Sequence, residues 1–189
     1  MNEQRRLLLH AGAAALLTGA CAQTASSQVS PPPIPTVAPP PGNAGDFDFL
    51  TGEWRISHRR LTAPGQWDEF LGEATVFSIL GGVGSVEELR IPARNFSGMG
   101  LRLLDVENRV WNDFWVNGRS GVLTTPGQTG GFINGEGTFG ADDVDGDQPI
   151  KVRGIWDSIT PSSCRWWQSI SRDGGRSWEE NWFMDWVRA

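Results

Sequence analysis

The alternation of apolar and polar residues at a spacing of two is the feature that most constrains this chain. From Asp46 to Ala189 apolar residues recur at alternate positions, and Gly, Pro, Asn and Asp interrupt the pattern about every 8 to 12 residues. No segment carries a convincing helical periodicity. A spacing of two sends successive side chains to opposite faces of a sheet. The pattern therefore predicts that this segment is an all-β domain.

Ten segments carry the strand pattern. They are Gly52–Leu61, Glu69–Leu80, Ser85–Ile91, Met99–Leu104, Arg109–Asn117, Gly121–Thr125, Gly130–Gly140, Pro149–Ser158, Ser163–Ser171 and Trp178–Val187. Short links between consecutive strands favour an antiparallel meander, and an open meander would leave two unpaired edges. Because closure removes both edges, we predict a single antiparallel up-and-down β-barrel of about ten strands. A β-sandwich is the alternative that the pattern leaves open.

The first 22 residues have the layout of an export signal. A basic pair, Arg5 and Arg6, precedes an apolar run that is too short and too rich in Ala for a stable membrane span. The pair resembles a twin-arginine signal, and an ordinary secretory signal is the alternative. The run ends at Cys21 in a sequence that resembles a bacterial lipobox, which predicts lipidation of Cys21. Cleavage after Ala22 by a different signal peptidase is the competing interpretation.

Residues 23–45 are rich in Ser, Thr, Gln and Pro and cannot bury a core, so they are interpreted as a disordered linker. The linker would hold the domain of residues 46–189 away from a surface. Together with Cys21 it predicts an exported protein, either an outer-membrane lipoprotein or a periplasmic one. The predicted contact with a membrane is through the N-terminal lipid alone.

The net charge and the small number of His and Cys residues argue against some classes of function. The formal net charge of -6 argues against a nucleic-acid partner, because phosphate binding needs a basic face. Two His and two Cys leave little material for a metal site, and we predict none. The acidic run Asp142–Asp147 lacks the EF-hand spacing and is interpreted as a solvated hairpin tip. The oligomeric state is left open.

Several motifs resemble a known group of barrels. The stretch Phe47–Trp54 is similar to the F-x-F-L-x-G-x-W opening of lipocalin-like (calycin) barrels. The resemblance implies that Trp54 lies at the closed end of the first strand, with Arg188 of the last strand across it. The stretches Gly98–Asp105, Trp111–Trp115 and Ser171–Trp178 resemble a bacterial lipocalin-like family, domain of unknown function 1579. That family implies a fold and no established reaction.

His58 is the only histidine beyond the export signal, and it shares a strand face with Trp54. In an interior position its imidazole would suit a general base or a haem ligand, as in the related nitrobindin-type barrels. In those barrels the ligand histidine lies late in the chain, where this sequence has none. Haem is therefore disfavoured, and no cofactor is predicted. The alternative to a functional role is that His58 is a hydrogen-bonded structural histidine.

The ten Trp residues are unusual for this length, and most are explained by packing of the barrel. Adjacent Trp166 and Trp167 must face opposite sides of one strand. Charged or amide side chains also stand among apolar neighbours in strands. These are Glu88, Arg102, Asp113, Arg153 and Gln168.

These features predict a binding module that holds a small, partly apolar ligand in its interior. The predicted ligand-binding side chains are His58, Arg102, Trp115, Trp156, Trp167 and Trp182. Two alternatives remain: an enzyme of the same fold that uses His58 as an acid–base group, and a structural envelope protein with a filled barrel. No catalytic residue is assigned, and the sequence favours binding over catalysis.

Overall fold

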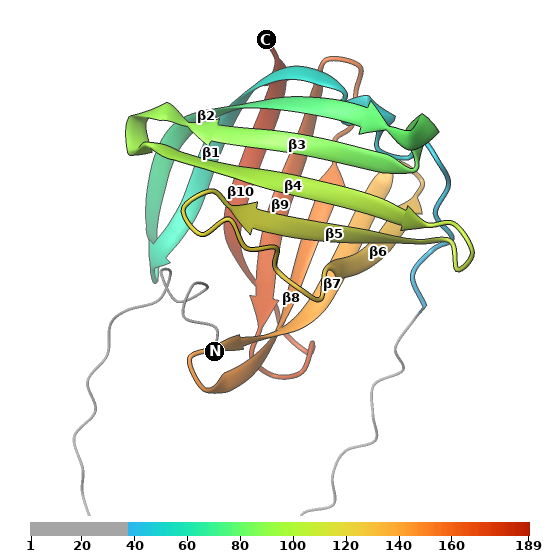
Figure 1. Cartoon of the computed structure of the whole chain (residues 1–189). Coiled ribbons are helices and arrows are strands. Elements are labelled where there is room, and N and C mark those ends of the chain that lie inside the picture. The colour runs from blue at the N-terminus through green and yellow to red at the C-terminus, as the bar shows by residue number, and fades with distance from the viewer. Residues whose placement is uncertain (1–37) are drawn as a thin grey trace, which may run out of the picture.

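The computed structural model describes residues 38–189, which form a closed antiparallel barrel of ten strands (Figure 1). The strands are β1 (Gly52–Ala63), β2 (Gln66–Ile79), β3 (Gly84–Ile91), β4 (Phe96–Asp105), β5 (Val110–Asn117), β6 (Gln128–Ile133), β7 (Glu136–Asp145), β8 (Gln148–Asp157), β9 (Ser163–Ser171) and β10 (Glu179–Arg188). Each strand pairs with the next, and β1 pairs with β10 to close the ring. The predicted all-β, up-and-down barrel is confirmed.

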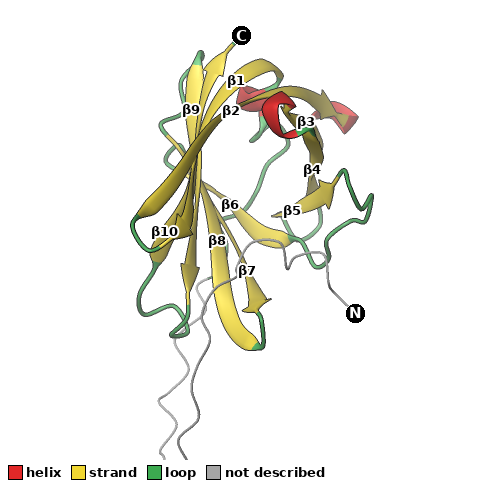
Figure 2. Cartoon of the chain, turned by 90° about the vertical axis from the view of Figure 1, so that its left-hand side faces the viewer, coloured by secondary structure: helices red, strands yellow, loops and turns green. Residues whose placement is uncertain are grey.

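The strands surround a common axis, with β3–β5 crossing in front of β8–β10 (Figures 1 and 2). Among the described residues there are three short 3₁₀ helices: η2 (Asp48–Leu50) in the segment before β1, and η3 (Leu80–Gly82) and η4 (Pro92–Arg94) in connections between strands. In β1 the alternation is plain, because Trp54, Ile56 and His58 are buried while the residues between them are exposed. Residues that pair across two neighbouring strands point to the same side of the sheet, so the inward face of β1 defines the inward face of its neighbours. Ile56 of β1, for example, pairs with the inward Trp186 of β10.

Two of the predicted strands are wrong. Gly121–Thr125 is a loop that touches β5 through one isolated bridge, between Val116 and Leu123. Gly130–Gly140 is a hairpin, in which β6 and β7 meet at a turn with φ values of 52° at Asn134 and 82° at Gly135. Both residues adopt the left-handed conformation that an Asn-Gly hairpin turn requires. The count of ten strands is right because these two errors cancel.

One end of the barrel is closed by the segment that precedes β1. The ring of Phe47 packs edge-on against Trp111 and Phe132, with centroid distances of 4.9 and 5.0 Å. Trp54 donates its indole N–H to the carbonyl of Leu50 at 2.6 Å. The segment is fastened to the turn between β4 and β5, where the N–H of Gly42 donates to the carbonyl of Arg109 (Figure 1). Aromatic side chains thus form a floor under the interior.

Arg188 lies across this floor. Its guanidinium carbon stands 4.0 Å from the centroid of the Trp54 ring. The two Nη atoms donate to the carbonyls of Thr51 and Phe49, and Nε donates to that of Pro161 at 3.3 Å. Because the last strand carries Arg188 and the entry segment carries the carbonyls, one side chain joins the two ends of the domain.

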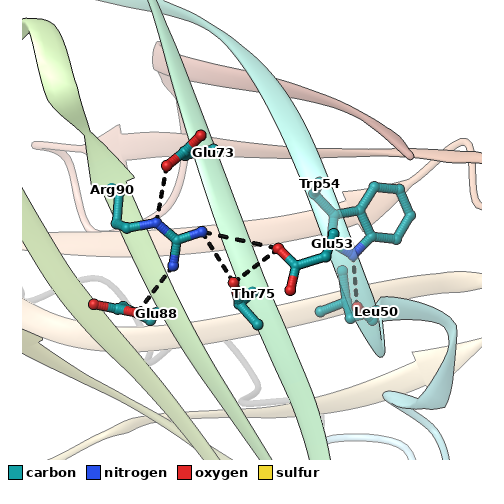
Figure 3. A network of polar contacts seen from close by, with 7 residues as sticks. All are labelled: Leu50, Glu53, Trp54, Glu73, Thr75, Glu88 and Arg90. Carbon is teal, nitrogen blue, oxygen red and sulfur yellow. Dashed lines mark hydrogen bonds and ion pairs between the residues drawn. The ribbon is translucent and has the colours of Figure 1, made fainter. Parts of the chain in front are cut away.

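On the outer wall, Arg90 of β3 links the first three strands (Figure 3). It donates to Glu73 at 3.0 Å, to Glu88 at 2.9 Å and to the hydroxyl of Thr75 at 2.9 Å, and Thr75 donates to Glu53 at 2.9 Å. These hydrogen bonds raise the pKa of Arg90 above its ordinary value. Exposed pairs of this kind contribute little each, so their main effect is to favour the register of β1–β3.

Replacing Arg188 with Ala should lower the free energy of unfolding by about 2 kcal/mol, because carbonyl partners and an indole face are left without the cation. Urea denaturation followed by tryptophan fluorescence measures the change. Arg176→Ala, in an exposed turn, serves as the matched control and should stay within about 0.5 kcal/mol of the wild type. Equal effects of the two substitutions would contradict the closing role of Arg188.

Candidate functional site

The two ends of the barrel interior differ in solvent contact. At the floor the inward side chains of Trp54, Trp111 and Trp186 are at most 1% exposed. Further along the axis the inward side chains of Trp115, Trp182 and Gln168 are only partly buried. Since the register points them inward, solvent reaches the interior beyond the floor. The end opposite Arg188 is therefore the open one, and the inward face between floor and open end is the candidate site.

A cluster of three charged side chains lies in this interior. Arg102 of β4 donates to Glu87 of β3 at 2.5 Å, and its Nε lies 3.7 Å from a carboxylate oxygen of Asp113 on β5. The side chains of Arg102, Glu87 and Asp113 are 5%, 3% and 20% exposed. Burying charges is costly unless they are paired, so such a group is rarely placed inside a barrel for stability alone.

Gly100 makes the contact between Arg102 and Glu87 possible. A Cβ at this position would lie 3.2 Å from Nη2 of Arg102 and 3.3 Å from the Glu87 carboxylate. Gly100 pairs directly with Glu87 across the β3–β4 ladder, so the missing side chain leaves room for the guanidinium to reach diagonally. A side chain opposite Glu87 would therefore crowd this ion pair.

Burial and charge set the protonation of the cluster. Burial raises the pKa of Asp113 to about 6, against the opposing influence of Arg102. Burial alone would lower the pKa of Arg102, but the nearby carboxylates of Glu87 and Asp113 outweigh it and raise the pKa. At neutral pH Asp113 is therefore largely ionised, and Arg102 is a cation.

Arg102 also touches the aromatic floor. Its guanidinium carbon lies 5.2 Å from the ring centroid of Phe47 and 5.3 Å from that of Trp156. Trp156 in turn packs on Trp186 at a centroid distance of 5.5 Å. The charged cluster and the floor thus form one continuous surface at the closed end of the interior.

His58 lies on the same inward face, nearer the open end. It is 2% exposed, stacks on Phe70 at 4.5 Å and accepts the indole N–H of Trp182 through Nδ1 at 3.3 Å. Burial, with a smaller contribution from the Arg94 cation, lowers the pKa of His58 to about 4. The imidazole is therefore neutral at pH 7, and because Nδ1 accepts, its proton is on Nε2.

Arginines border His58 at the open end. Arg94 lies over Phe70, with 3.5 Å from its guanidinium carbon to the ring centroid, and makes two 2.8 Å hydrogen bonds to Asp68. Arg60 lies over Trp182 at 5.0 Å. These contacts give the open end an aromatic lining that is bordered by cations.

Five of the six predicted ligand-binding side chains face the interior: His58, Arg102, Trp115, Trp156 and Trp182. They do not all meet, because Trp156 belongs to the floor while His58 and Trp182 lie near the open end.

The placement of Trp167 is wrong. It lies on the outer face, donates to Asp157 at 2.8 Å and stacks on Phe183 at 6.3 Å. Its neighbour Trp166 faces inward against Trp182. The register of β9 with β10 decides between the two residues.

Sequence reasoning missed Glu87. Of the charged or amide side chains noted in strands, Arg102, Asp113 and Gln168 face inward, whereas Glu88 and Arg153 face outward. The exposed position of Glu88 shows that its neighbour Glu87 is the inward carboxylate of β3. The sequence carries no local signal that separates Glu87 from Glu88, because only the pairing of β3 with its neighbours fixes which of the two faces inward.

Other predicted features fall outside the interior. Asp142 and Asp145 of the acidic run pair with Lys151 and Arg172, each at 2.7 Å. Within residues 38–189 there is no group of three or more His, Cys, Asp or Glu side chains placed to hold a metal, and no helix long and apolar enough to cross a membrane. The export signal, Cys21 and most of the linker lie outside the described residues.

A hollow of about 440 Å³ lies on the outer side of the β6–β7 hairpin. It is lined by Pro40, Gly131, Ile133, Asn134, Glu136 and Thr138. None of these residues belongs to the charged cluster or to the predicted ligand-binding set. We therefore place the candidate site in the barrel interior rather than in this hollow.

Comparison with known proteins adds little to the geometry. No family model matches the chain, domain of unknown function 1579 included, and no curated protein matches it. Among solved structures the chain is similar to Rv2717c from M. tuberculosis, with 11% sequence identity and a TM-score of 0.48. The match covers 76% of this chain and 94% of that one.

The lowered pKa of His58 predicts a pH-dependent loss of stability. In the unfolded chain the imidazole binds a proton at its ordinary pKa of 6.5, whereas the folded chain binds it only near 4, so protonation favours unfolding as pH falls through this window. Between pH 7.5 and pH 5 the wild type should lose about 2 kcal/mol relative to His58→Phe. Asp113 titrates in both proteins, so its opposite contribution cancels in the difference.

Urea denaturation of both proteins at a series of pH values measures this difference. A difference that does not change with pH would show that His58 becomes protonated in the folded state as readily as in the unfolded one.

Proposed function

We propose that this protein is a binding module that holds a small, partly apolar ligand in its barrel interior. The observation that carries the proposal is the inward face between floor and open end, where Trp115, Trp166 and Trp182 retain solvent contact. Partly exposed aromatic rings around a few buried polar groups are the usual lining of a small-molecule site. The Glu87–Arg102–Asp113 cluster supplies those polar groups.

The surroundings of His58 favour binding over the alternative of an enzyme. An acid–base residue works best with a pKa near the operating pH and a partner that orients it. His58 has a pKa of about 4, and its partner among the described residues is the indole of Trp182 rather than a carboxylate. Cys164 offers no nucleophile either, because burial raises its thiol pKa to about 12.

The proposal includes a relationship to calycin barrels. It is supported by the G-x-W opening of β1 and by the contact of Arg188 with Trp54. It also includes export and attachment by a lipid at Cys21, for which the support is the sequence of residues 1–22. Attachment there would place the barrel in the periplasm or at the outer membrane, beside a supply of apolar small molecules.

Binding in the interior can be tested with the neutral dye Nile red and the full-length protein. The emission of the dye should rise and shift to shorter wavelength in the apolar interior, and Trp115→Ala should weaken its affinity by about fivefold, since one ring contact is worth on the order of 1 kcal/mol. Trp167→Ala, on the outer face, is the matched control and should change the affinity by less than about twofold. Absence of dye binding, or equal effects of both variants, would refute an interior site.

Lipid attachment can be tested separately. Cys21→Ala, expressed in the native host, should move the protein from the membrane fraction to the soluble one and remove the mass of the acyl groups in intact-protein mass spectrometry. Recovery of an unmodified wild-type chain cleaved after Ala22 would contradict the lipid anchor and leave the interior site unaffected.

A further inference from the structure

Five inward side chains carry polar atoms that are buried and make no hydrogen bond among the described residues. The atoms are Nε2 of His58, Oγ of Ser85, Nε and Nη1 of Arg102, and Nε1 of both Trp156 and Trp186. Buried polar groups in folded proteins are nearly always hydrogen-bonded, so a set of unmatched ones on a single inward surface points to a missing partner. The following inference rests on the proposed function and concerns the chemistry of the ligand.

Almost all of these unmatched atoms are hydrogen-bond donors. Guanidinium and indole nitrogens can only donate. Nε2 of His58 also carries a proton, since Nδ1 accepts from Trp182. Only the hydroxyl of Ser85 can play either role. A ligand that satisfies this surface must therefore present hydrogen-bond acceptors.

Three of the donors are adjacent at the closed end. The guanidinium of Arg102 lies over the Trp156 ring at 5.3 Å, and Trp156 packs on Trp186 at 5.5 Å. The side chain of Arg102 is 5% exposed, and Trp156 and Trp186 are 2% and 1% exposed. A ligand that carries acceptor groups at its inner end would meet these three side chains, while its apolar part would extend along Trp115 and Trp166.

Charge decides which acceptors fit. The guanidinium of Arg102 is already neutralised by Glu87 at 2.5 Å, and Asp113 adds a second carboxylate with its oxygen 3.7 Å from Nε. An anionic ligand would bring a third negative group into a buried cluster with one cation, and like charges at close range oppose binding strongly. A neutral carbonyl accepts the same hydrogen bonds without that repulsion.

We propose that the barrel interior selects neutral ligands whose inner end is a carbonyl, as in an amide, ester or ketone, and discriminates against carboxylates. Arg102, Trp156 and Trp186 supply the donors. Asp113 acts as the discriminating residue, because its negative charge repels an anion and its side chain, 20% exposed, faces the solvent-reached part of the interior. An amide, which also carries N–H groups, can donate to Asp113 in return.

A near-isosteric pair of probes tests the proposal, 1-naphthylacetamide and 1-naphthylacetate, each competing with Nile red in the full-length protein at pH 7.5. The amide should bind at least about tenfold tighter than the carboxylate. Asp113→Asn should raise the affinity for the carboxylate by about tenfold relative to that for the amide, so that the preference for the amide is largely lost. Asp147→Asn removes the same charge at an exposed hairpin tip and should change neither affinity.

The outcomes separate this inference from the proposed function. If Nile red fails to bind, interior binding itself is refuted. If the dye binds but the two probes compete equally, or neither competes, the selection for neutral carbonyls is overturned while interior binding stands. The wild-type comparison needs no variant, so the inference remains falsifiable even if Asp113→Asn does not fold. Equal responses to Asp113→Asn and Asp147→Asn would assign the effect to net charge and overturn the role of Asp113.

Discussion

The closed ring of backbone hydrogen bonds is the constraint on which the rest of this structure depends. Once β1 pairs with both β2 and β10, no strand can turn over without breaking two ladders, so each residue is fixed to the inner or the outer face. Arg188 helps keep this ring closed by joining the last strand to the entry segment. The inward placement of Arg102 and His58 follows from register rather than from any preference of these side chains for burial.

This constraint explains why a polar interior persists in a barrel with an aromatic floor. The aromatic floor contributes apolar burial, whereas the cluster around Arg102 costs desolvation. The carboxylates offset this cost at Arg102, but at Asp113 the cation offsets it only in part. Gly100 provides the space that allows Arg102 and Glu87 to pair, and a larger residue there would crowd both. Replacing such a cluster with apolar side chains often leaves a protein as stable or more so, which favours a functional reason for its presence.

The sequence predicted most of the fold because alternation is a local property. The inward face of β1 could be read from Trp54 and His58 alone, and β9 was predicted with its observed bounds, Ser163–Ser171. What the sequence did not reveal depends on pairing between strands. The turn at Asn134-Gly135 is an exception, because Asn-Gly is itself a local hairpin signal, and it was missed since the apolar pattern continues across this Gly-rich stretch. Trp166 and Trp167, by contrast, are equivalent until β10 sets the register. Glu87 and Glu88 present the same ambiguity, which only the pairing of β3 with β2 and β4 removes.

The same pairing gives the candidate site its chemical character. Glu87, Arg102 and Asp113 lie on three consecutive strands, and each alone resembles an ordinary charged residue in a strand. Adjacent strands bring them together in a region where water is scarce, so charge and hydrogen-bonding capacity there cannot be balanced by solvent as on the outer wall around Arg90. On that wall an unmatched donor has little consequence. In the cluster the surplus of donors and the second carboxylate beside one guanidinium together define the ligand that would complete the site: one that accepts hydrogen bonds and carries no negative charge.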